Sequence, residues 1–369
     1  MSVQTYPSYS RLPASAAALF DDAREGDLFR SGNWHAQMER TGLRPGDGLR
    51  LYALETSPGQ ALVALLPAHY SRLYPSHPGA RVLHFLQPDE QPYEPLTRVG
   101  DAGTPDAARQ VIAAIRAEPR AYDVIRASPL DPGSRFAHDI TRALRETGHF
   151  MQAYRQPDNR YETVAGLTFQ DYLAARSRPL RETLERHNRL LLQGGRGRFF
   201  MARDREQLDD AWGAVHHAIA TTPSDVPPES ADHLRAIMGV AADADALRLG
   251  MFFIDDKPAN AQFWVVNRGV AHCLRLWSGP DQRTFPFDDL LTQMMALYLI
   301  DADHVTELDF GGISDEFADA WAPKSRERIG VVAFNRRTAR GLRGAARHIG
   351  VGMLKALPAR LWRRLRGQR

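Results

Sequence analysis

The chain has 369 residues, of which 43% are hydrophobic and 25% charged, a composition typical of a globular protein with two cores. No apolar run reaches the roughly 18–20 residues that a membrane-spanning helix requires. The single cysteine, Cys273, excludes an intrachain disulfide. The first residues lack a basic segment followed by an apolar one, so we expect no secretory signal and a cytoplasmic protein.

Charge is distributed unevenly. Residues 336–369 contain ten Arg, one Lys and no acid, and removing this +11 from the total of +3 leaves −8 for the rest of the chain. A body of that sign disfavours a phosphate backbone, so we expect no nucleic acid partner. Residues 339–369 mix Arg with apolar residues, which is typical of helices that lie peripherally on the inner face of an anionic membrane. Packing on the acidic body and a disordered end are the alternatives.

The first half of the chain predicts a helix and then a strand, a turn and a strand. The expected elements are a helix over 15–43, strands over 49–55, 61–72 and 82–87, a helix over 107–118, a strand over 122–130 and a helix over 135–147.

The second half repeats this order. The expected elements are a helix over 168–193 that ends at Gly194-Gly195, a strand over 199–203, a helix over 205–221, strands over 247–255, 261–267 and 270–278, a helix over 285–302, and strands over 305–311 and 328–334.

Two segments about 198 residues apart resemble each other: LRLYALETSPGQALVALL and LRLGMFFIDDKPANAQFWV share LRL, a turn at matching distance and a second strand. Such an echo indicates duplication. Hairpins that alternate with crossover helices predict an α/β (α+β) protein with two mixed, mostly antiparallel sheets flanked by helices. We expect domains over 1–150 and 151–338 and a basic tail over 339–369.

Strong catalytic motifs are absent. There is no Walker loop, GxSxG elbow, Gly-rich dinucleotide fingerprint or metal-ligand spacing, and His216-His217 diverge on a helix, so we expect no metal. The Arg-rich helix is either a solvated face or a face for an anionic partner. Its basic residues are Arg176, Arg178, Arg181, Arg186, His187 and Arg189.

The strands over 261–311 carry the best candidate site. Gln262 and Trp264 share one strand face by alternation, and His272 and Arg275 follow on the next strand. Imidazole can accept a proton near neutral pH, so His272 is a candidate general base, with a structural role as the alternative. Asp309 ends a strand before two glycines, where a site carboxylate and a turn residue are both common.

Three segments resemble a known family. NRYETVAGLTFQDYLAARSRPLRETLERHNRLL (159–191), the P-A-x-A-Q-x-W core of 258–264, and DFGG–DEFADAW–RERIGVVAFN (309–335) are similar to the cellulose-biosynthesis-type acetyltransferase domains, a branch of the GNAT acyltransferases. The resemblance covers about 160–340, and the first half looks like a weaker copy, as in tandem GNAT proteins. The chain departs from the family pattern at Asp288, where a small Gly-containing loop is usual, and at Phe317-Ala318, where Tyr-Lys is usual.

The resemblance implies a sheet that splits to admit the donor and a helix start that holds the donor's pyrophosphate. If catalysis is retained, the positions described above make His272, Asp309 and Gln262 the expected catalytic residues. The implied donor-binding residues are Arg275, Asp288, Asp289, Leu290, Gly311 and Gly312.

We therefore expect an N-acyltransferase that uses acetyl-CoA or another acyl-CoA and acts on a small-molecule or glycan amine, in exopolysaccharide or cell-envelope biosynthesis. The departures leave open a degenerate GNAT-fold binding or scaffold protein. A tandem GNAT transferase that uses aminoacyl-tRNA is a further alternative, which the charge of −8 opposes.

Overall fold

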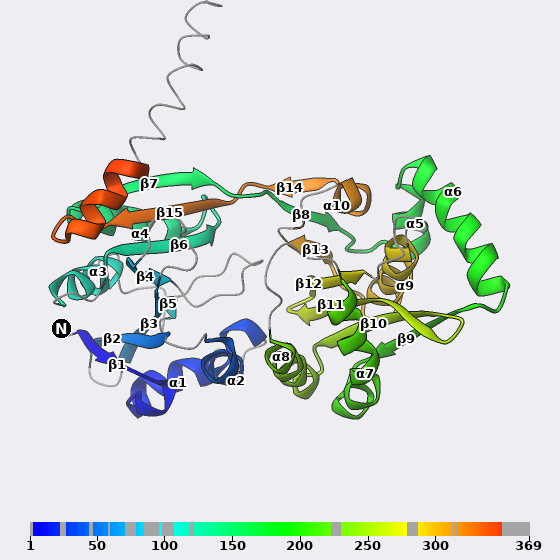
Figure 1. The fold of residues 1–369 in the computed structure, drawn as a ribbon, viewed down its shortest axis with the longest axis horizontal. Helices are drawn as coiled ribbons and strands as arrows, with labels where there is room; N and C mark the ends of the chain where they lie inside the picture. Colours follow the sequence, from blue (N-terminus) through cyan, green and yellow to red (C-terminus); the bar gives the residue numbers. More distant parts are fainter. Residues whose placement is uncertain are drawn as a thin grey trace, which may run out of the picture. The chain divides into compact units, whose positions relative to one another are not determined.

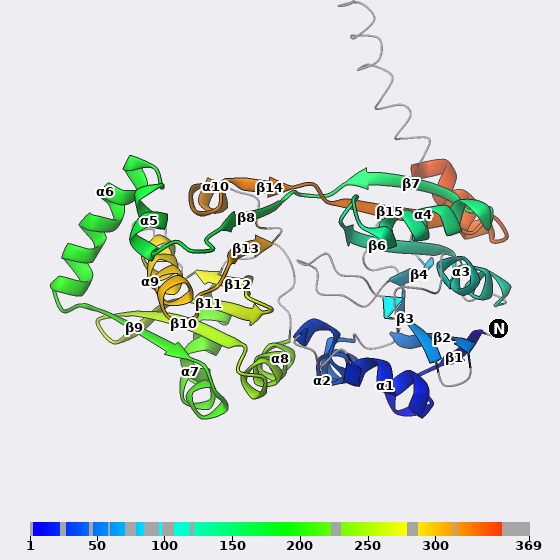
Figure 2. The same cartoon turned by 180° about the vertical axis from the view of Figure 1, so that it is seen from behind.

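The computed structural model describes residues 3–22, 27–43, 47–57, 60–70, 79–84, 96–97, 107–118, 122–222, 230–278, 287–311, 313 and 316–348. The chain forms two compact units from interleaved segments (Figures 1 and 2). Unit 1 comprises Met1–Leu19, Leu43–Gln156 and Arg328–Arg369, and unit 2 comprises Phe20–Gly42 and Pro157–Glu327. Each unit contains one mixed sheet flanked by helices, which confirms the predicted fold class.

The sheet of unit 1 has the order β1-β2-β3-β4-β6-β15-β7, with β5 paired to β3. All its neighbours are antiparallel except β4 and β6. The strands are β1 (Val3–Tyr6), β2 (Gly48–Ser57), β3 (Gln60–Tyr70), β4 (Arg81–His84), β5 (Leu96–Thr97), β6 (Val124–Leu130), β7 (Phe150–Arg155) and β15 (Ile329–Phe334), and the helices are η1 (Tyr9–Arg11), α1 (Ala14–Asp22), α3 (Ala107–Ala117), α4 (Arg135–Glu146) and residues 339–348.

Strand alternation gives this sheet two buried faces. Ile125 points toward the apolar stripes of α3 and α4, which include Ile112 and Ile140. Val124 points to the other face, where it joins a second cluster with Ala345 of the C-terminal helix. Residues 339–348 of the predicted basic tail therefore pack on unit 1, and residues 349–369 lie outside the described residues.

The sheet of unit 2 has the order β14-β8-β13-β12-β11-β10-β9, and only β12 and β13 are parallel. The strands are β8 (Asn159–Thr163), β9 (Gly197–Ala202), β10 (Leu247–Ile254), β11 (Lys257–Asn267), β12 (Val270–Ser278), β13 (Glu307–Gly311) and β14 (Lys324–Arg326), and the helices are η2 (Leu28–Arg30), α2 (Gly32–Gln37), η3 (Met38–Gly42), α5 (Phe169–Ala174), α6 (Arg178–His187), η4 (Asn188–Gln193), α7 (Arg205–Thr221), α8 (Ala231–Asp243), α9 (Phe287–Asp301) and α10 (Glu316–Trp321).

Two apolar clusters cover the two faces of this second sheet. Phe263 of β11 packs with α7, α8 and the N-terminal segment that carries Trp34. Trp264, the next residue, packs on the opposite face with α5, α6, α9 and α10. The helices on both faces leave little of the sheet's apolar surface in water.

The two sheets have the same plan. Each path has four antiparallel strands, a fifth strand that is parallel to the fourth, and two further antiparallel strands. A helix precedes the fifth strand. The predicted echo corresponds to the hairpins β2–β3 and β10–β11. The sixth strand of each sheet is exchanged: β15 inserts between β6 and β7, and β8 inserts between β13 and β14. The predicted domains are contiguous, whereas the structure assigns residues 20–42 to unit 2 and β15 to unit 1.

The predicted helix over 168–193 is three elements. Ser177 caps α6 by accepting the backbone N–H of Leu180, and Pro179 lies in the first turn of α6. Proline cannot continue an existing helix because it lacks an N–H group, so α5 ends before it. None of the helices described here has both the length and the hydrophobicity needed to cross a bilayer.

Candidate functional site

The sheet of unit 2 opens between β12 and β13. These parallel strands pair only over three positions, which end at His272 opposite Asp309. Beyond His272, β12 continues to Ser278 beside β11 alone, and a bulge near Trp264 shifts its register. The ladder between β12 and β13 therefore ends at this point, and a ladder that ends within a sheet is where an extended ligand can pair with a strand.

His272 and Asp309 form a pair where the strands part. The imidazole Nδ1 lies 3.5 Å from Asp309 Oδ2, and the other carboxylate oxygen accepts the Gly311 backbone N–H at 2.7 Å. Asp309 is buried, and the ring of Phe29 packs edge-on against His272 with 5.4 Å between centroids. A carboxylate on one ring nitrogen orients a histidine that can use the other nitrogen as a base.

The predicted catalytic role of Gln262 does not agree with its position. Its side chain lies on the opposite face of the sheet from His272, toward α9. Its Nε2 donates to Thr292 Oγ1 at 2.7 Å and its Oε1 accepts the indole N–H of Trp264 at 3.0 Å. Gln262 is 1% exposed, so it joins β11 to α9 rather than contacting a substrate.

The start of α9 carries two carboxylates that already accept hydrogen bonds from other side chains. Asp288 accepts hydrogen bonds from Asn260 Nδ2 at 2.9 Å and from Ser278 Oγ at 2.7 Å. Asp289 accepts the Trp321 indole N–H at 2.8 Å. Burial raises the pKa of the Asp289 carboxyl, against the Trp321 hydrogen bond and with the help of the negative charge of Asp288. Both side chains are thus held by β11, β12 or α10.

The remaining predicted donor-binding residues differ in whether they could reach a ligand. Leu290 is fully buried in the core, so only its backbone could contact a ligand. Arg275 donates from its guanidinium to the Leu274 carbonyl at 2.5 Å and stays beside its own strand. Gly311 has φ of +63°, which suits glycine, and its N–H is used by Asp309. Gly312 lies outside the described residues.

Phe317 and Ala318, which depart from the family pattern, pack in the apolar core of unit 2. Ala318 is fully buried, and Phe317 packs against Phe310 with 6.3 Å between ring centroids. A lysine at 318 would place an ammonium group in this apolar cluster. The replacement of Tyr-Lys therefore agrees with the packing of α10.

Sequence reasoning missed Asn260 and Phe29. Asn260 is 1% exposed, and its Oδ1 has no hydrogen-bond donor among the described residues. A polar residue within the strand run PANAQFW was the available signal for Asn260. Phe29 is distant in sequence and could not be linked to His272 without the fold.

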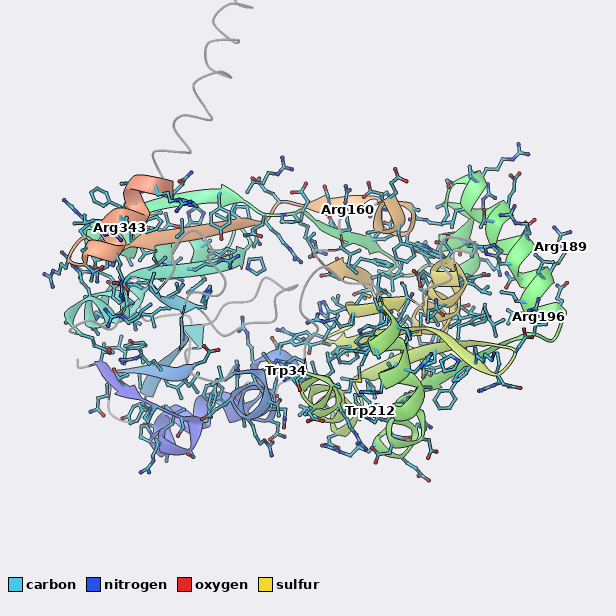
Figure 3. The ribbon with its side chains drawn as sticks, viewed as in Figure 1. Trp34, Arg160, Arg189, Arg196, Trp212 and Arg343 are labelled. Carbon is cyan, nitrogen blue, oxygen red and sulfur yellow. The ribbon has the colours of Figure 1, made fainter. Side chains whose placement is uncertain are left out.

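The basic helix is mostly a solvated face. Arg176 and His187 are buried, and Arg176 binds Glu162 Oε2 at 2.9 Å and the Trp321 carbonyl at 2.7 Å. The other arginines are exposed, and Arg189 points outward from unit 2 (Figure 3). Within the part of the chain that the structure describes, no three His, Cys, Asp or Glu side chains gather as metal ligands would.

Comparisons with known proteins show similarity to one domain family. The family model of the acetyltransferase (GNAT) domain matches residues 178–319, all within unit 2. A search of curated protein sequences finds no match. The match is to the GNAT domain in general, so the cellulose-biosynthesis branch stays a prediction.

Solved structures share the fold over both units. The C-terminal domain of a predicted lysylphosphatidylglycerol synthetase from Agrobacterium fabrum is 11% identical, with 89% of this chain and 95% of that chain covered and a TM-score of 0.54. FemX is 11% identical, with 91% and 98% covered and a TM-score of 0.55. This chain therefore has two units with the GNAT fold, and residues 178–319 of unit 2 match the acetyltransferase (GNAT) domain.

Proposed function

We propose that unit 2 transfers an acyl group from a CoA thioester, such as acetyl-CoA, to an amine of a small molecule or glycan. The observation that carries this proposal is the His272–Asp309 pair at the point where β12 and β13 part. The resemblance supports an envelope polymer or its precursor as the setting.

In the proposed reaction, Asp309 orients the imidazole and His272 acts as the base. Asp309 Oδ2 lies 3.5 Å from Nδ1, at ion-pair distance, and the Gly311 N–H fixes the carboxylate, so Nε2 is the nitrogen proposed to accept a proton. The acceptor nitrogen attacks the thioester carbonyl carbon, and its proton passes to His272. The carbon–sulfur bond then breaks, and the departing thiolate takes that proton from the imidazolium to leave as the thiol. Phe29 limits the rotation of the imidazole.

The start of α9 fits a CoA pyrophosphate in part. Helix N-terminal N–H groups favour an anion. The negative charge of Asp288 opposes it, although the hydrogen bonds from Asn260 and Ser278 disperse that charge. Asp289 turns its carboxylate toward the Trp321 indole, from which it accepts a hydrogen bond at 2.8 Å.

A second candidate donor is an activated aminoacyl group. The buried Oδ1 of Asn260 can only accept a hydrogen bond, and the neighbouring Asp288 is also an acceptor. An ammonium group would satisfy both, whereas a phosphate would satisfy neither. The name of the Agrobacterium fabrum protein, a lysylphosphatidylglycerol synthetase, supports the same chemical class.

Calorimetric titration of the full chain separates these candidates. Acetyl-CoA and an amide-linked 3′-aminoacyl-adenosine serve as the two donor probes. Binding of acetyl-CoA, weakened in Ser278→Ala, supports the first proposal, and binding of the aminoacyl probe alone, weakened in Asn260→Ala, supports the second. If neither probe binds at millimolar concentration, the transferase proposal fails and the degenerate binding protein stands.

A further inference from the structure

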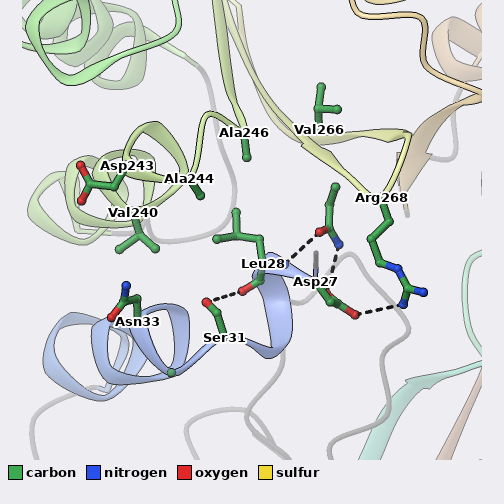
Figure 4. A pocket seen from close by; sticks show the side chains of 12 residues that line it. Asp27, Leu28, Ser31, Asn33, Val240, Asp243, Ala244, Ala246, Val266 and Arg268 are labelled. Atoms are coloured by element: carbon green, nitrogen blue, oxygen red, sulfur yellow. Dashed lines mark hydrogen bonds and ion pairs between the residues drawn. The ribbon is translucent and has the colours of Figure 1, made fainter. Parts of the chain in front are cut away.

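A polar cavity of about 320 Å³ lies within unit 2, at the end of the sheet where β11 turns into β12 (Figure 4). Its walls come from the segment that contains η2 and the start of α2, from the C-terminal end of α8, and from the β11–β12 turn. Its volume is at the lower end of the range of small-ligand sites, which is about 300–1,000 Å³.

Asp27 is held in a fixed orientation on one wall. Its Oδ1 accepts from Asn267 Nδ2 at 3.1 Å, and Asn267 Oδ1 accepts the Leu28 backbone N–H at 2.9 Å. Both polar atoms of the Asn267 amide are therefore used to position this wall, and Asn267 is 8% exposed. The orientation of Asp27 is set before a ligand arrives, which lowers the entropic cost of binding.

The second carboxylate oxygen of Asp27 is only loosely paired. Asp27 Oδ2 lies 3.4 Å from Arg30 Nε and 3.9 Å from the nearest guanidinium nitrogen of Arg268. These separations are longer than good charge-assisted hydrogen bonds, which are about 2.7–2.9 Å. The Arg268 side chain is 64% exposed, so it can move toward a ligand at little cost.

The opposite wall contributes a second acid and an amide. Asp243, at the end of α8, is fixed by the guanidinium of Arg205. Asn33 lies on the α2 side and faces Val240 across the cavity (Figure 4). The lining thus offers the Asp27 carboxylate, one adjustable guanidinium and a neutral amide, because both Asp243 oxygens are already bound by Arg205.

We infer that this cavity binds a small zwitterion that carries an ammonium group and a carboxylate, as amino acids and short peptides do. The ammonium would donate to Asp27 Oδ2, and the carboxylate would accept from Arg268. A phosphate would meet the negative charge of Asp27, and an apolar ligand would leave the polar lining without partners.

The cavity lies near the candidate base. Phe29 belongs to the same turn as Leu28 of the cavity wall, and it packs on His272. The inference rests on the proposed function in one respect: it assigns to the acceptor a zwitterionic end that binds in this cavity, apart from the amine that is acylated.

Calorimetry on the full chain tests the site itself. Glycine and glycylglycine are the probes, and they separate a free amino acid from a peptide end. Ethylamine and propionate are control ligands, each with one of the two charges. We expect at least one zwitterion to bind at least tenfold more tightly than either control ligand. Equal affinities, or no binding of either zwitterion, would overturn the inference.

Variants locate the site. Arg268→Gln should weaken zwitterion binding at least tenfold without lowering the thermal midpoint, because the side chain is exposed. Asp27→Asn should have the same effect on binding. Arg196→Gln, an exposed arginine paired with Asp255 outside the cavity, should bind as the wild type does. Unchanged binding in both cavity variants would place the ligand elsewhere and reject the site.

The acceptor role has a separate readout. If acetyl-CoA is consumed with ethylamine while no zwitterion binds, the inference fails and the proposed function stands. If a zwitterion binds in the cavity but no donor binds, the site stands and the proposed function fails.

Discussion

Gln262 shows how a single buried amide can hold two elements together. It bonds Thr292 of α9 and the indole of Trp264, and all three side chains are buried. Gln262→Met keeps the length of the side chain but leaves both partners without a hydrogen bond. We expect the free energy of unfolding to fall by about 2–4 kcal/mol, because two buried polar groups lose their partners.

Chemical denaturation with tryptophan fluorescence measures this change. Gln193→Met, at an exposed position in η4, is the matched control and should leave the free energy of unfolding unchanged. A Gln262→Met protein as stable as the wild type would reject the structural role and restore Gln262 as a candidate for catalysis.

His149 makes unit 1 sensitive to acid. Burial lowers its pKa to about 4, and its ring contacts Tyr122 Oη at 2.6 Å and Thr147 Oγ1 at 3.0 Å. The unfolded chain, with a histidine pKa near 6.5, takes up the proton first as the pH falls. Stability should therefore decrease between about pH 6.5 and 4, by on the order of 3 kcal/mol from this group.

Thermal midpoints between pH 7.5 and 4 test this effect. His149→Gln should flatten the decline with falling pH, and His138→Gln, an exposed histidine of α4, should retain the wild-type slope. Parallel slopes for all three proteins would contradict the assignment.

At the candidate site, the sequence identified the residue types but not their geometry. His272 and Asp309 could be chosen because one lies in a strand and the other ends a strand before glycine. Their pairing depends on β12 and β13 being parallel neighbours, which a crossover helix permits but does not require. The contact of Phe29 with His272 could not be predicted from the sequence, because the two residues are more than two hundred positions apart.

Among the elements, β15 joins two strands of unit 1 that come from a distant part of the chain. It supplies the central partner of both β6 and β7, and Val332 at its middle is fully buried. Val332→Asp would bury an unpaired carboxylate and should cost more than about 4 kcal/mol in unit 1.

Hydrogen exchange shows whether Val332→Asp destabilises unit 1 alone or the whole protein. The amides of β6 and β7 should lose protection in Val332→Asp, while those of β10 and β11 in unit 2 keep it. Glu327→Ala, at an exposed position just before β15, should exchange as the wild type does. Retained protection in β6 and β7 would contradict the exchanged-strand arrangement.

Local patterns predicted most strands and helices but not the exchanged ones. The hairpins and crossover helices follow from alternation and turn residues, which act over a few positions. The strand over 328–334 was predicted, yet its sheet depends on pairing across the whole chain. The break between α5 and α6 was available in the sequence at Ser177 and Pro179, where a cap and a first-turn proline coincide.

At the scale of the whole molecule, unit 2 depends on residues far from the GNAT segment. Leu28, Phe29 and Trp34 are buried in the core with α7 and α8, and the Leu28 N–H bonds Asn267. A fragment of residues 157–327 would expose the surface that these side chains cover. We expect that fragment to unfold without a cooperative thermal transition.

Restoring the missing segment is the control. Residues 20–42 joined to 157–327 through a flexible linker should recover a cooperative transition, because unit 2 is then complete. A fragment of 157–327 that melts cooperatively at the temperature of the longer polypeptide would show that the N-terminal segment contributes nothing to unit 2.

Thiol release from acetyl-CoA in the presence of an amine tests the central claim most directly. His272→Gln removes the proposed base, and His217→Gln changes an exposed histidine of α7 as the control. We predict that His272→Gln lowers kcat by roughly 10²–10⁴-fold, as loss of a general base does, while His217→Gln keeps the wild-type rate. A His272→Gln protein that releases thiol at the wild-type rate would contradict the proposed site.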